Sequence, residues 1–327
     1  MARKFVLDFH RAPGDVLMVS ALVRDLKRTY GDRYDVTVKT NFPAIWRNNP
    51  FLANSDLHEA GVEVVKLNEV RAMQRSQNGQ QRHYVSAYHW DFEQRTKVRV
   101  PLLAPKGDLY LDEIERTQPL VFGRYWVIVA GGKTDTTNKI WPQMRYQEVV
   151  DRLRCYGLRF VQEGAVKAMH AHRPLERVLC LLGRTSQRDL MVNIYHADGV
   201  ICPVTFPMHL AAVWDKPCVV IAGGREEPWW EWYGPGEHFG PNCAAVKTPH
   251  RFLHTVGQLS CCPRVGCWRR RTLALRDNHP EFDKKLCPHP ILRPRSETVA
   301  ECMDMIQVDH VVEAVMSYYT DGTLPLP

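Results

Sequence analysis

The sequence predicts an α/β fold built from two parallel sheets, each flanked by helices. Short apolar runs rich in β-branched residues alternate with helical patterns along the chain, as in βαβ units. The alternation stops in a stretch punctuated by proline and glycine at residues 101–119 and then begins again. The chain has 327 residues, which is enough for two domains of ordinary size. We therefore predict two Rossmann-like domains, at residues 1–118 and 119–327.

The individual elements follow from local hydrophobic periodicity. In the first half, strands are expected at residues 5–9, 34–39 and 62–67, a helix at 15–30, and a polar loop at 71–82. The second half opens with the apolar run WVIVAGG and continues with a strand near residue 160 and helices at 146–156, 187–196 and 308–319. Two such halves are expected to face each other across a cleft.

Composition is that of an ordinary globular protein, with 45% hydrophobic and 24% charged residues. No apolar run approaches the roughly 20 residues that span a bilayer. The N-terminal residues enter a predicted strand without the apolar segment of a signal peptide, so we expect a cytoplasmic protein with no transmembrane segment. The net charge of +7 suits an anionic ligand such as a sugar nucleotide, a phosphorylated glycan or nucleic acid, although a solvated basic surface gives the same charge.

The most informative segment is VTFPMHLAAVWDKPCVVIAGGRE, residues 204–226. Thr205 is placed to cap a helix whose first turn contains Pro207, and CVVI predicts a buried parallel strand that ends at paired glycines. In α/β sheets, ligands bind beyond the carboxyl ends of the strands, where a helix N-terminus offers its N–H groups to a phosphate. The segment therefore predicts a nucleotide-phosphate site.

This segment resembles the donor-binding signature of glycosyltransferase family 9, which includes the ADP-heptose:lipopolysaccharide heptosyltransferases. That signature is an Asp-Thr-Gly run at a helix start, then His, a small apolar stretch, Lys-Pro, and a strand that runs into Gly. The matching positions are Thr205, His209, Ala211, Ala212, Lys216, Pro217 and Gly223. Val204 and Phe206 stand where the family has Asp and Gly, and these changes leave the backbone amides of the helix start untouched.

Three further segments resemble the family in the same order and spacing. They are KFVLDFHRAPGDVLMVSALVRDLKRTYG, KIWPQMRYQEVVDRL and LLGRTSQRDLMVNIYHADGVI, whereas residues 45–120 match weakly. The resemblance implies an inverting, metal-independent glycosyltransferase of the GT-B fold with a nucleotide-sugar donor, for which ADP-heptose is a candidate. The acceptor is left open among lipopolysaccharide core, another glycan, a protein and DNA.

Asp15, in the loop Pro13-Gly14-Asp15, is the candidate catalytic base. Transfer to a hydroxyl needs a base near the acceptor oxygen, and the resemblance implies that the Asp of this Gly-Asp motif has that role. The alternative is that Asp15 only caps the first helix, because Asp is a favoured N-cap residue.

Lys139, in the Lys-x-Trp-Pro segment, is the candidate cation for the leaving diphosphate. Negative charge develops on the diphosphate as the glycosidic bond breaks, and a fixed cation stabilises that charge in the transition state. The resemblance places the phosphate-binding lysine in this context. Lys133 lies close in sequence as a second candidate, and the alternative for either residue is an ordinary surface lysine.

The loop at residues 223–230 supplies further candidates for donor binding. Its paired glycines allow close backbone approach, Arg225 is expected on a phosphate, and Glu226 on ribose hydroxyls. Trp229, Trp230 and Trp232 are either stacking residues for the base or sugar, or part of the core. The full set of predicted donor-binding residues is Gly14, Lys133, Thr205, Phe206, Pro207, Met208, His209, Gly223, Gly224, Arg225 and Glu226.

Five of the ten cysteines fall in a basic segment with little periodic apolar content, at positions 261, 262, 267, 287 and 302. Such a segment cannot build its own core, but four thiolates around a zinc or iron ion would fix it. We expect a structural site formed by Cys262, Cys267, Cys287 and Cys302, with Cys261 as the alternative to Cys262. Some heptosyltransferases that modify bacterial autotransporters carry a four-cysteine iron site, and this cluster looks similar. Buried or free thiols are the other interpretation.

Arg264 and the run Arg269-Arg270-Arg271 border the cysteines. A basic patch beside an aromatic residue can contact nucleic acid. One alternative function is therefore a nucleic-acid-binding protein on a degenerate glycosyltransferase scaffold. A second alternative is a sugar-nucleotide epimerase, a class that can share the two-domain fold but needs no acceptor.

Overall fold

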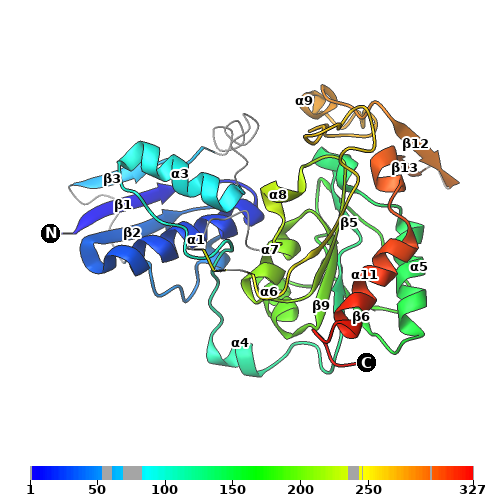
Figure 1. The fold of residues 1–327 in the computed structure, drawn as a ribbon, viewed down its shortest axis with the longest axis horizontal. Helices are drawn as coiled ribbons and strands as arrows, with labels where there is room; N and C mark the ends of the chain where they lie inside the picture. The colour runs from blue at the N-terminus through cyan, green and yellow to red at the C-terminus, as the bar shows by residue number, and fades with distance from the viewer. Residues whose placement is uncertain are drawn as a thin grey trace. The chain divides into compact units, whose positions relative to one another are not determined.

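The computed structural model describes residues 2–53, 61–68, 83–234, 243–244, 246–294 and 297–326 (Figure 1). The predicted loop at 71–82 lies outside these residues. The chain divides into two compact units. The first consists of Met1–Gln118, Ala212–Asp215 and Trp229–Pro249, and the second of Pro119–Ala211, Lys216–Pro228 and His250–Pro327.

In the first unit, the described strands form a parallel sheet of order β2-β1-β3. The strands are β1 (Arg3–Asp8), β2 (Tyr34–Lys39) and β3 (Val62–Val65), close to the predicted positions. Helices α1 (Pro13–Tyr30) and α3 (Tyr84–Thr96) pack against each other beside this sheet (Figure 1). The short helix α4 (Glu113–Thr117) lies in the stretch that the sequence predicted as a linker.

A buried charged network joins α1 to its surroundings. The Asp25 carboxylate is fully buried, accepts hydrogen bonds from Nε of Arg24 (2.7 Å) and the N–H of Leu103 (3.0 Å), and contacts Nε2 of His89 at 3.1 Å. Burial alone would raise the pKa of Asp25, but its bonds with His89 and Arg24 hold that pKa below the ordinary value. Removing one partner of this network would leave a buried charge unpaired, which is strongly destabilising.

In the second unit, six parallel strands lie in the order β11-β10-β9-β4-β6-β8. They are β4 (Trp126–Ile128), β6 (Phe160–Gln162), β8 (Leu179–Cys180), β9 (Gly199–Pro203), β10 (Cys218–Gly223) and β11 (Arg251–His254). Successive strands are added on one side of β4 up to β8, and on the other side from β9 onward. The order therefore reverses between β4 and β9, as in dinucleotide-binding folds.

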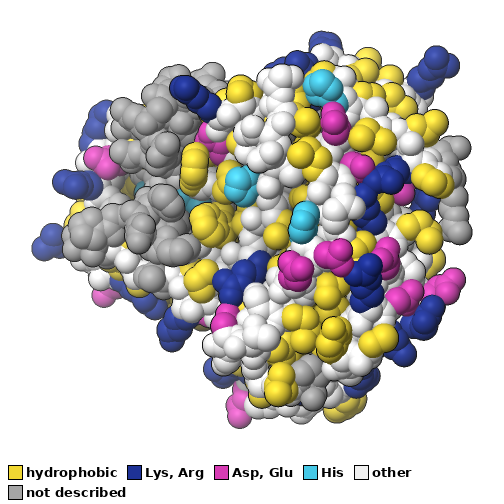
Figure 2. Space-filling view, turned by 45° about the vertical axis from the view of Figure 1, so that its right-hand side comes forward, with side chains coloured by type: hydrophobic (Ala, Val, Ile, Leu, Met, Phe, Trp, Pro, Cys, Tyr) yellow, Lys and Arg dark blue, Asp and Glu magenta, His cyan; other side chains and the backbone are white. Residues whose placement is uncertain are grey.

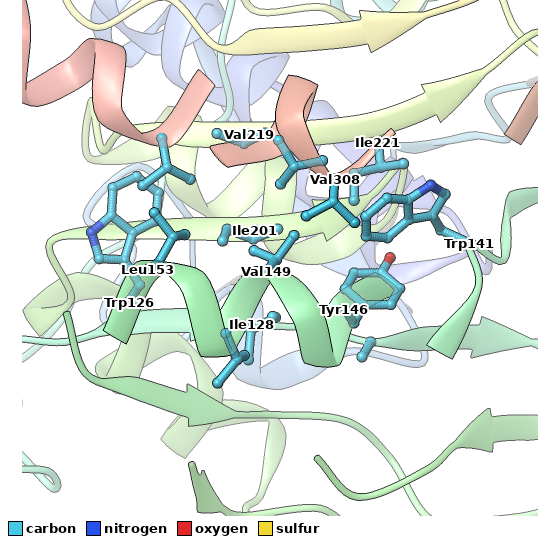
Figure 3. Packing of buried hydrophobic residues seen from close by; sticks show 14 of the residues in the cluster. Trp126, Ile128, Trp141, Tyr146, Val149, Leu153, Ile201, Val219, Ile221 and Val308 are labelled. Atoms are coloured by element: carbon cyan, nitrogen blue, oxygen red, sulfur yellow. The ribbon is translucent and has the colours of Figure 1, made fainter. Parts of the chain in front are cut away.

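Helices cover this sheet and close its core. They include α5 (Gln143–Arg154), α6 (Gln187–His196), α7 (Phe206–Val213) and α11 (Val308–Thr320), which confirm the three predicted helices and the helix expected at Pro207. Figure 3 shows Val149 and Leu153 of α5 facing Ile201 and Val219 of the sheet, with Val308 of α11 in the same cluster. The predicted α/β architecture with parallel sheets is thus confirmed.

The run WVIVAGG does not form one strand. β4 ends at Ile128, and a second strand, β5 (Gly131–Lys133), pairs antiparallel with β7 (His170–His172) instead. Gly131 has φ +133°, and a Cβ there would lie 2.1 Å from the carbonyl oxygen of Ala171. The chain therefore bends at a position that only glycine can occupy.

The segment after β11 contains α9 (Pro280–Asp283), a hairpin of β12 (Pro290–Arg293) and β13 (Glu297–Ala300), and α10 (Glu301–Asp304). Figure 1 shows α9 and this hairpin, in orange, at one end of the second unit. Among the described residues, no helix is both long and apolar enough to cross a membrane.

Candidate functional site

Lys139 lies at the reversal point of the second unit's sheet. It is the last residue of the 3₁₀ segment η3 (Thr134–Lys139), which follows β5 and has a non-helical kink at Thr136. Its Nζ donates a hydrogen bond to the carbonyl oxygen of Val204, the residue directly after β9, at 3.3 Å. The structure thus brings the predicted diphosphate lysine to the carboxyl end of β9, where open α/β sheets bind their ligands.

Helix α7 starts at this same edge of the sheet. It begins at Phe206, with Thr205 directly before it and Pro207 in its first turn, as predicted. The side chains of Phe206, Pro207, Met208 and His209 are buried, whereas Thr205 is partly exposed. Within this set Thr205 therefore has the side chain best placed for a ligand, and the other contacts expected at a helix start are those of backbone N–H groups.

An ion-pair cluster joins the lysine to the loop after β10. Lys139 Nζ lies 2.8 Å from Oε1 of Glu226, and the Arg225 guanidinium pairs with the same oxygen. Glu226 is 4% exposed, and its Oε2 is buried without a hydrogen-bond partner among the described residues, as is Oδ1 of Asn138 in η3. Unpaired buried acceptors are costly, so these two atoms fit a ligand that donates hydrogen bonds, such as a sugar nucleotide with its hydroxyls.

The paired glycines of the same loop lie against sulfur atoms of this chain. A Cβ on Gly223, which has φ +63°, would lie 2.4 Å from Sδ of Met303, and a Cβ on Gly224 would lie 2.9 Å from Sγ of Cys262. The space beside the two glycines is occupied by Met303 and Cys262, which follow them in the chain. The absence of side chains at the glycines therefore makes room for these sulfur atoms, and the close approach of a ligand stays a prediction.

Lys133 and Trp230, two further candidates for donor binding, lie in different surroundings. Lys133 is exposed on β5. Trp230 of α8 (Pro228–Glu231) is fully buried in the first unit, with its ring 5.9 Å from that of Tyr84, and so belongs to the core.

Asp15 belongs to the first unit and lies in the first turn of α1. The N-cap of that helix is Ala12, so Asp15 is its third residue and not the cap considered as an alternative. Tyr88 of α3 donates a hydrogen bond from its hydroxyl to Oδ1 of Asp15 at 2.8 Å. Burial raises the pKa of nearby Tyr233 well above its usual value, and the charges of Glu231 and Asp15 add to that rise. Gly14 precedes Asp15 in the same turn and is buried.

Tyr88 is a site residue that the sequence analysis missed. It is fully buried, and its ring meets that of Phe9 edge-on at 5.3 Å. The only signal in the sequence is the aromatic spacing of Tyr84, Tyr88 and Phe92 along one helix face, which predicts a core stripe. Whether the hydroxyl of Tyr84 or that of Tyr88 contacts Asp15 depends on how α3 packs on α1.

We expect Tyr88→Phe to reduce turnover about tenfold and to move the acid limb of the pH–rate profile to higher pH. The ionised carboxylate loses a hydrogen bond that favours its charged form, which is the form a general base needs. Tyr125→Phe is the matched control, because Tyr125 is equally buried and donates to the carbonyl oxygen of Asn193 in the other unit. A Tyr88→Phe profile that superimposes on the control would contradict a role in positioning Asp15.

The structure gathers the five clustered cysteines around the loop after β10. Burial raises the pKa of the Cys302 thiol to about 12, and Cys267, Cys287 and Cys262 add to the rise. Burial likewise raises the pKa of Cys261 to about 11, with contributions from Cys262, Cys267 and Cys287. None of the ten cysteines, all within the described residues, is in a disulfide.

Backbone groups nearby oppose the effect of burial at three of these thiols. Burial raises the pKa of all three, whereas Gly224 lowers the pKa of Cys302, Arg269 that of Cys267, and His289 that of Cys287. Across the described residues, however, no group of three or more His, Cys, Asp and Glu side chains is arranged to hold a metal ion as it stands. The predicted four-cysteine metal site is therefore not shown.

The arginines beside the cysteines do not form a uniform solvated patch. Arg271 is fully buried and paired with Asp277 and Asp283. On the face shown in Figure 2, acidic and basic side chains of the described residues lie beside one another. Arg271 therefore does not contribute to a basic stripe of the kind that binds nucleic acid.

The family model for glycosyltransferase family 9 (heptosyltransferase) matches residues 56–235. The chain belongs to this family. It is therefore a glycosyltransferase, and the resemblance seen in its sequence is confirmed at the level of the family. No match to a curated protein was found.

Solved structures with the same fold span nearly all of this family 9 enzyme. The family 9 glycosyltransferase from Veillonella parvula is 14% identical with a TM-score of 0.61, covering 98% of this chain and 97% of its own. The E. coli ADP-heptose lipopolysaccharide heptosyltransferase II is 13% identical with a TM-score of 0.56, covering 99% and 100%. The iron-containing dodecameric glycosyltransferase TibC from enterotoxigenic E. coli is 15% identical with a TM-score of 0.64, covering 98% and 77%. At these identities the likeness shows a shared fold.

Proposed function

We propose that this family 9 glycosyltransferase moves a sugar from a nucleotide-diphosphate donor to a hydroxyl acceptor with inversion. The observation that carries the proposal is the position of Lys139, at the strand-order reversal and beside the start of α7. A cation and a helix N-terminus at one sheet edge are complementary to a diphosphate. TibC, which shares the fold, was solved in complex with ADP-D-β-D-heptose, so ADP-heptose is the first donor to test.

In the proposed reaction, Asp15 accepts the proton of the acceptor hydroxyl as its oxygen attacks the anomeric carbon. The new C–O bond forms on the face opposite the leaving group, and the bond to the diphosphate breaks with its electron pair. Lys139 stabilises the charge on that diphosphate. Oε2 of Glu226 and Oδ1 of Asn138 accept hydrogen bonds from hydroxyls of the sugar nucleotide, because both are buried acceptors without a hydrogen-bond partner in the described part of the chain.

A thermal-shift panel of ADP, GDP, UDP and CDP tests donor binding. We expect one nucleotide to raise the unfolding temperature more than the others, because a ligand that binds the native state stabilises it by mass action. Incubating the matching nucleotide sugar with and without an acceptor then separates the functions. Transfer or slow donor hydrolysis supports a transferase, whereas a new epimer formed from donor alone would contradict it. A salt-dependent shift of labelled DNA with no nucleotide response would favour the nucleic-acid alternative.

We propose further that the gathered thiols of Cys262, Cys267, Cys287 and Cys302 hold one structural zinc or iron ion, with Cys261 spare. The donor set suits these metals, and the backbone groups that oppose the effect of burial on the pKa of three of these thiols would favour thiolates. TibC is described as iron-containing, which supports the proposal for a chain of the same fold. The metal would fix the segment and would have no part in the transfer step.

Protein purified without chelator is expected to contain one equivalent of zinc or iron per chain. Elemental analysis measures this, and the Cys287→Ser variant, which loses one proposed ligand, should contain much less. Cys155→Ser is the control, because Cys155 is exposed at the end of α5. A metal content near zero in the unaltered chain, together with five freely reactive thiols in the native state, would show that the cluster binds nothing.

The remaining assignments stay predictions. The acceptor is a hydroxyl-bearing glycan, protein or nucleic acid, and the cytoplasm is the predicted compartment.

A further inference from the structure

Residues 267–272 lie within the cysteine-rich segment (residues 261–302). They run along the two loops of the proposed donor site, which are the loop after β10 and η3. The first half of this stretch follows the loop after β10. The N–H of Cys267 donates to the carbonyl oxygen of Gly224 at 3.2 Å, and the N–H of Trp268 donates to that of Arg225 at 3.1 Å. Nε of Arg225 in turn donates to the carbonyl oxygen of Arg269 at 2.8 Å. The loop that carries Glu226 is thus bonded along its length to the cysteine-rich segment.

The second half of the stretch follows η3, which ends in Lys139. The N–H of Asn138 donates to the carbonyl oxygen of Arg270 at 3.1 Å, and the N–H of Thr272 donates to Oγ1 of Thr137 at 2.9 Å. The hydroxyls of Thr137 and Thr272 lie 3.1 Å apart. Six consecutive residues therefore hold both loops.

Arg271 is the centre of this arrangement. Its guanidinium is 0% exposed, and Nε donates to the carbonyl oxygen of Thr134, the first residue of η3, at 2.8 Å. The other nitrogens donate to both carboxylate oxygens of Asp277, at 3.0 and 2.7 Å, and to Asp283 at 2.8 Å. A planar fork fixed on three partners holds its direction better than a flexible ammonium would.

The two loops meet where Lys139 pairs with Glu226, at 2.8 Å. Each partner is fixed to residues 267–272 from its own side, so the relative position of ammonium and carboxylate depends on that stretch. A charged contact to a diphosphate requires its cation to be preorganised, because a displacement of even 1 Å weakens it.

We infer that residues 267–272 position Lys139 for the donor diphosphate, and that Arg271 is the positioning residue. The inference rests on the proposed role of Lys139. Arg271 is fully buried within the protein and acts through η3, so it is not a catalytic residue. The cysteine-rich segment then has a function beyond its own folding, because any contact that holds its sulfur atoms in place also holds the loop after β10 and η3.

Calorimetric titration with ADP and with AMP tests the inference. Arg271→Ala should weaken ADP binding about tenfold, equivalent to about 1.4 kcal/mol, and AMP binding much less, because the terminal phosphate of the diphosphate depends on Lys139. Arg271→Lys should lie between Arg271→Ala and the unaltered chain, since it keeps the charge but not the fork. Thr137→Val, which removes both contacts of the Thr137 hydroxyl with Thr272, should weaken ADP binding about threefold.

Tyr318→Phe is the matched control for a general loss of stability. The Tyr318 hydroxyl is buried and bonds to the carbonyl oxygen and N–H of Cys218 at the start of β10. We expect this variant to unfold at lower temperature and to bind ADP as before. If Arg271→Ala does not fold, Arg271→Lys and Thr137→Val decide by the same criteria.

Unchanged ADP affinity in the folded Arg271 and Thr137 variants would overturn the inference, as would equal losses for ADP and AMP. The Lys139→Ala variant separates this failure from that of the proposed function. If Lys139→Ala binds ADP normally, the proposed role of the lysine fails and the inference fails with it. If Lys139→Ala loses ADP affinity and the other variants do not, only the inference fails.

Discussion

Asp15→Asn is expected to lower turnover by about two to four powers of ten while the affinity for the donor stays close to that of the unaltered chain. Asparagine keeps the shape of the side chain and can still contact the Tyr88 hydroxyl, 2.8 Å away in the structure. It cannot accept the proton of the acceptor hydroxyl at neutral pH. The loss should therefore appear in the rate of transfer, measured with saturating donor and acceptor, and hardly in donor binding.

Asp32→Asn provides the control for this experiment. Asp32 is fully exposed in the same unit, and its side chain lies 3.5 Å from Nζ of Lys27. The same chemical change there should leave turnover unaltered. Near-normal turnover in Asp15→Asn would reduce Asp15 to a structural partner of Tyr88, and the base would have to be sought elsewhere.

Lys139→Ala is expected to weaken ADP binding and to slow transfer by roughly two to three powers of ten. The leaving diphosphate loses a charge-assisted contact, and Glu226 loses the ammonium that lies 2.8 Å from its carboxylate. Because Glu226 is buried and, among the residues that the structure describes, would keep the ion pair with Arg225 alone, some loss of thermal stability should accompany the loss of function.

Two companion variants separate charge from stability. Lys139→Arg keeps a cation beside Glu226 and should retain stability. It should bind ADP less well than the unaltered chain, because the arginine side chain is longer and its guanidinium differs in shape from an ammonium. Lys133→Ala removes an exposed lysine of β5 and should change neither quantity. Normal ADP affinity in Lys139→Ala with a loss in Lys133→Ala would move the diphosphate contact to Lys133.

The two βα halves of the chain were predictable from local pattern because burial on both faces leaves a strong periodic signal. β2 and α6 have the predicted bounds, and α1 and α11 differ by only one or two residues at an end. The local pattern does not show that the run WVIVAGG is divided between β4 and β5. The chain turns at Gly131 and pairs with β7, a strand distant in sequence. Only glycine fits there, because a side chain would clash with the backbone of β7.

The candidate site was predictable only in part. Asp15, Lys139 and the residues around Thr205 lie in short motifs with a definite order, so their positions at strand ends follow from topology. Tyr88 and Arg271 carry no such motif. Tyr88 looks like a core aromatic and Arg271 like one of three surface cations, and in the structure the first meets Asp15 and the second is buried under three hydrogen-bonding partners.

The sequence by itself determined the alternation of elements, the family and the loops that carry the candidate site residues, because these depend on neighbours within about thirty residues, the length of a βαβ unit. Only the tertiary structure decided what surrounds the chemical groups. It placed sulfur atoms of the C-terminal segment against Gly223 and Gly224, and it ran residues 267–272 beside η3. Such contacts join segments from about forty to more than 130 residues apart, and their partners are selected by packing and hydrogen-bond satisfaction, for which no local pattern exists.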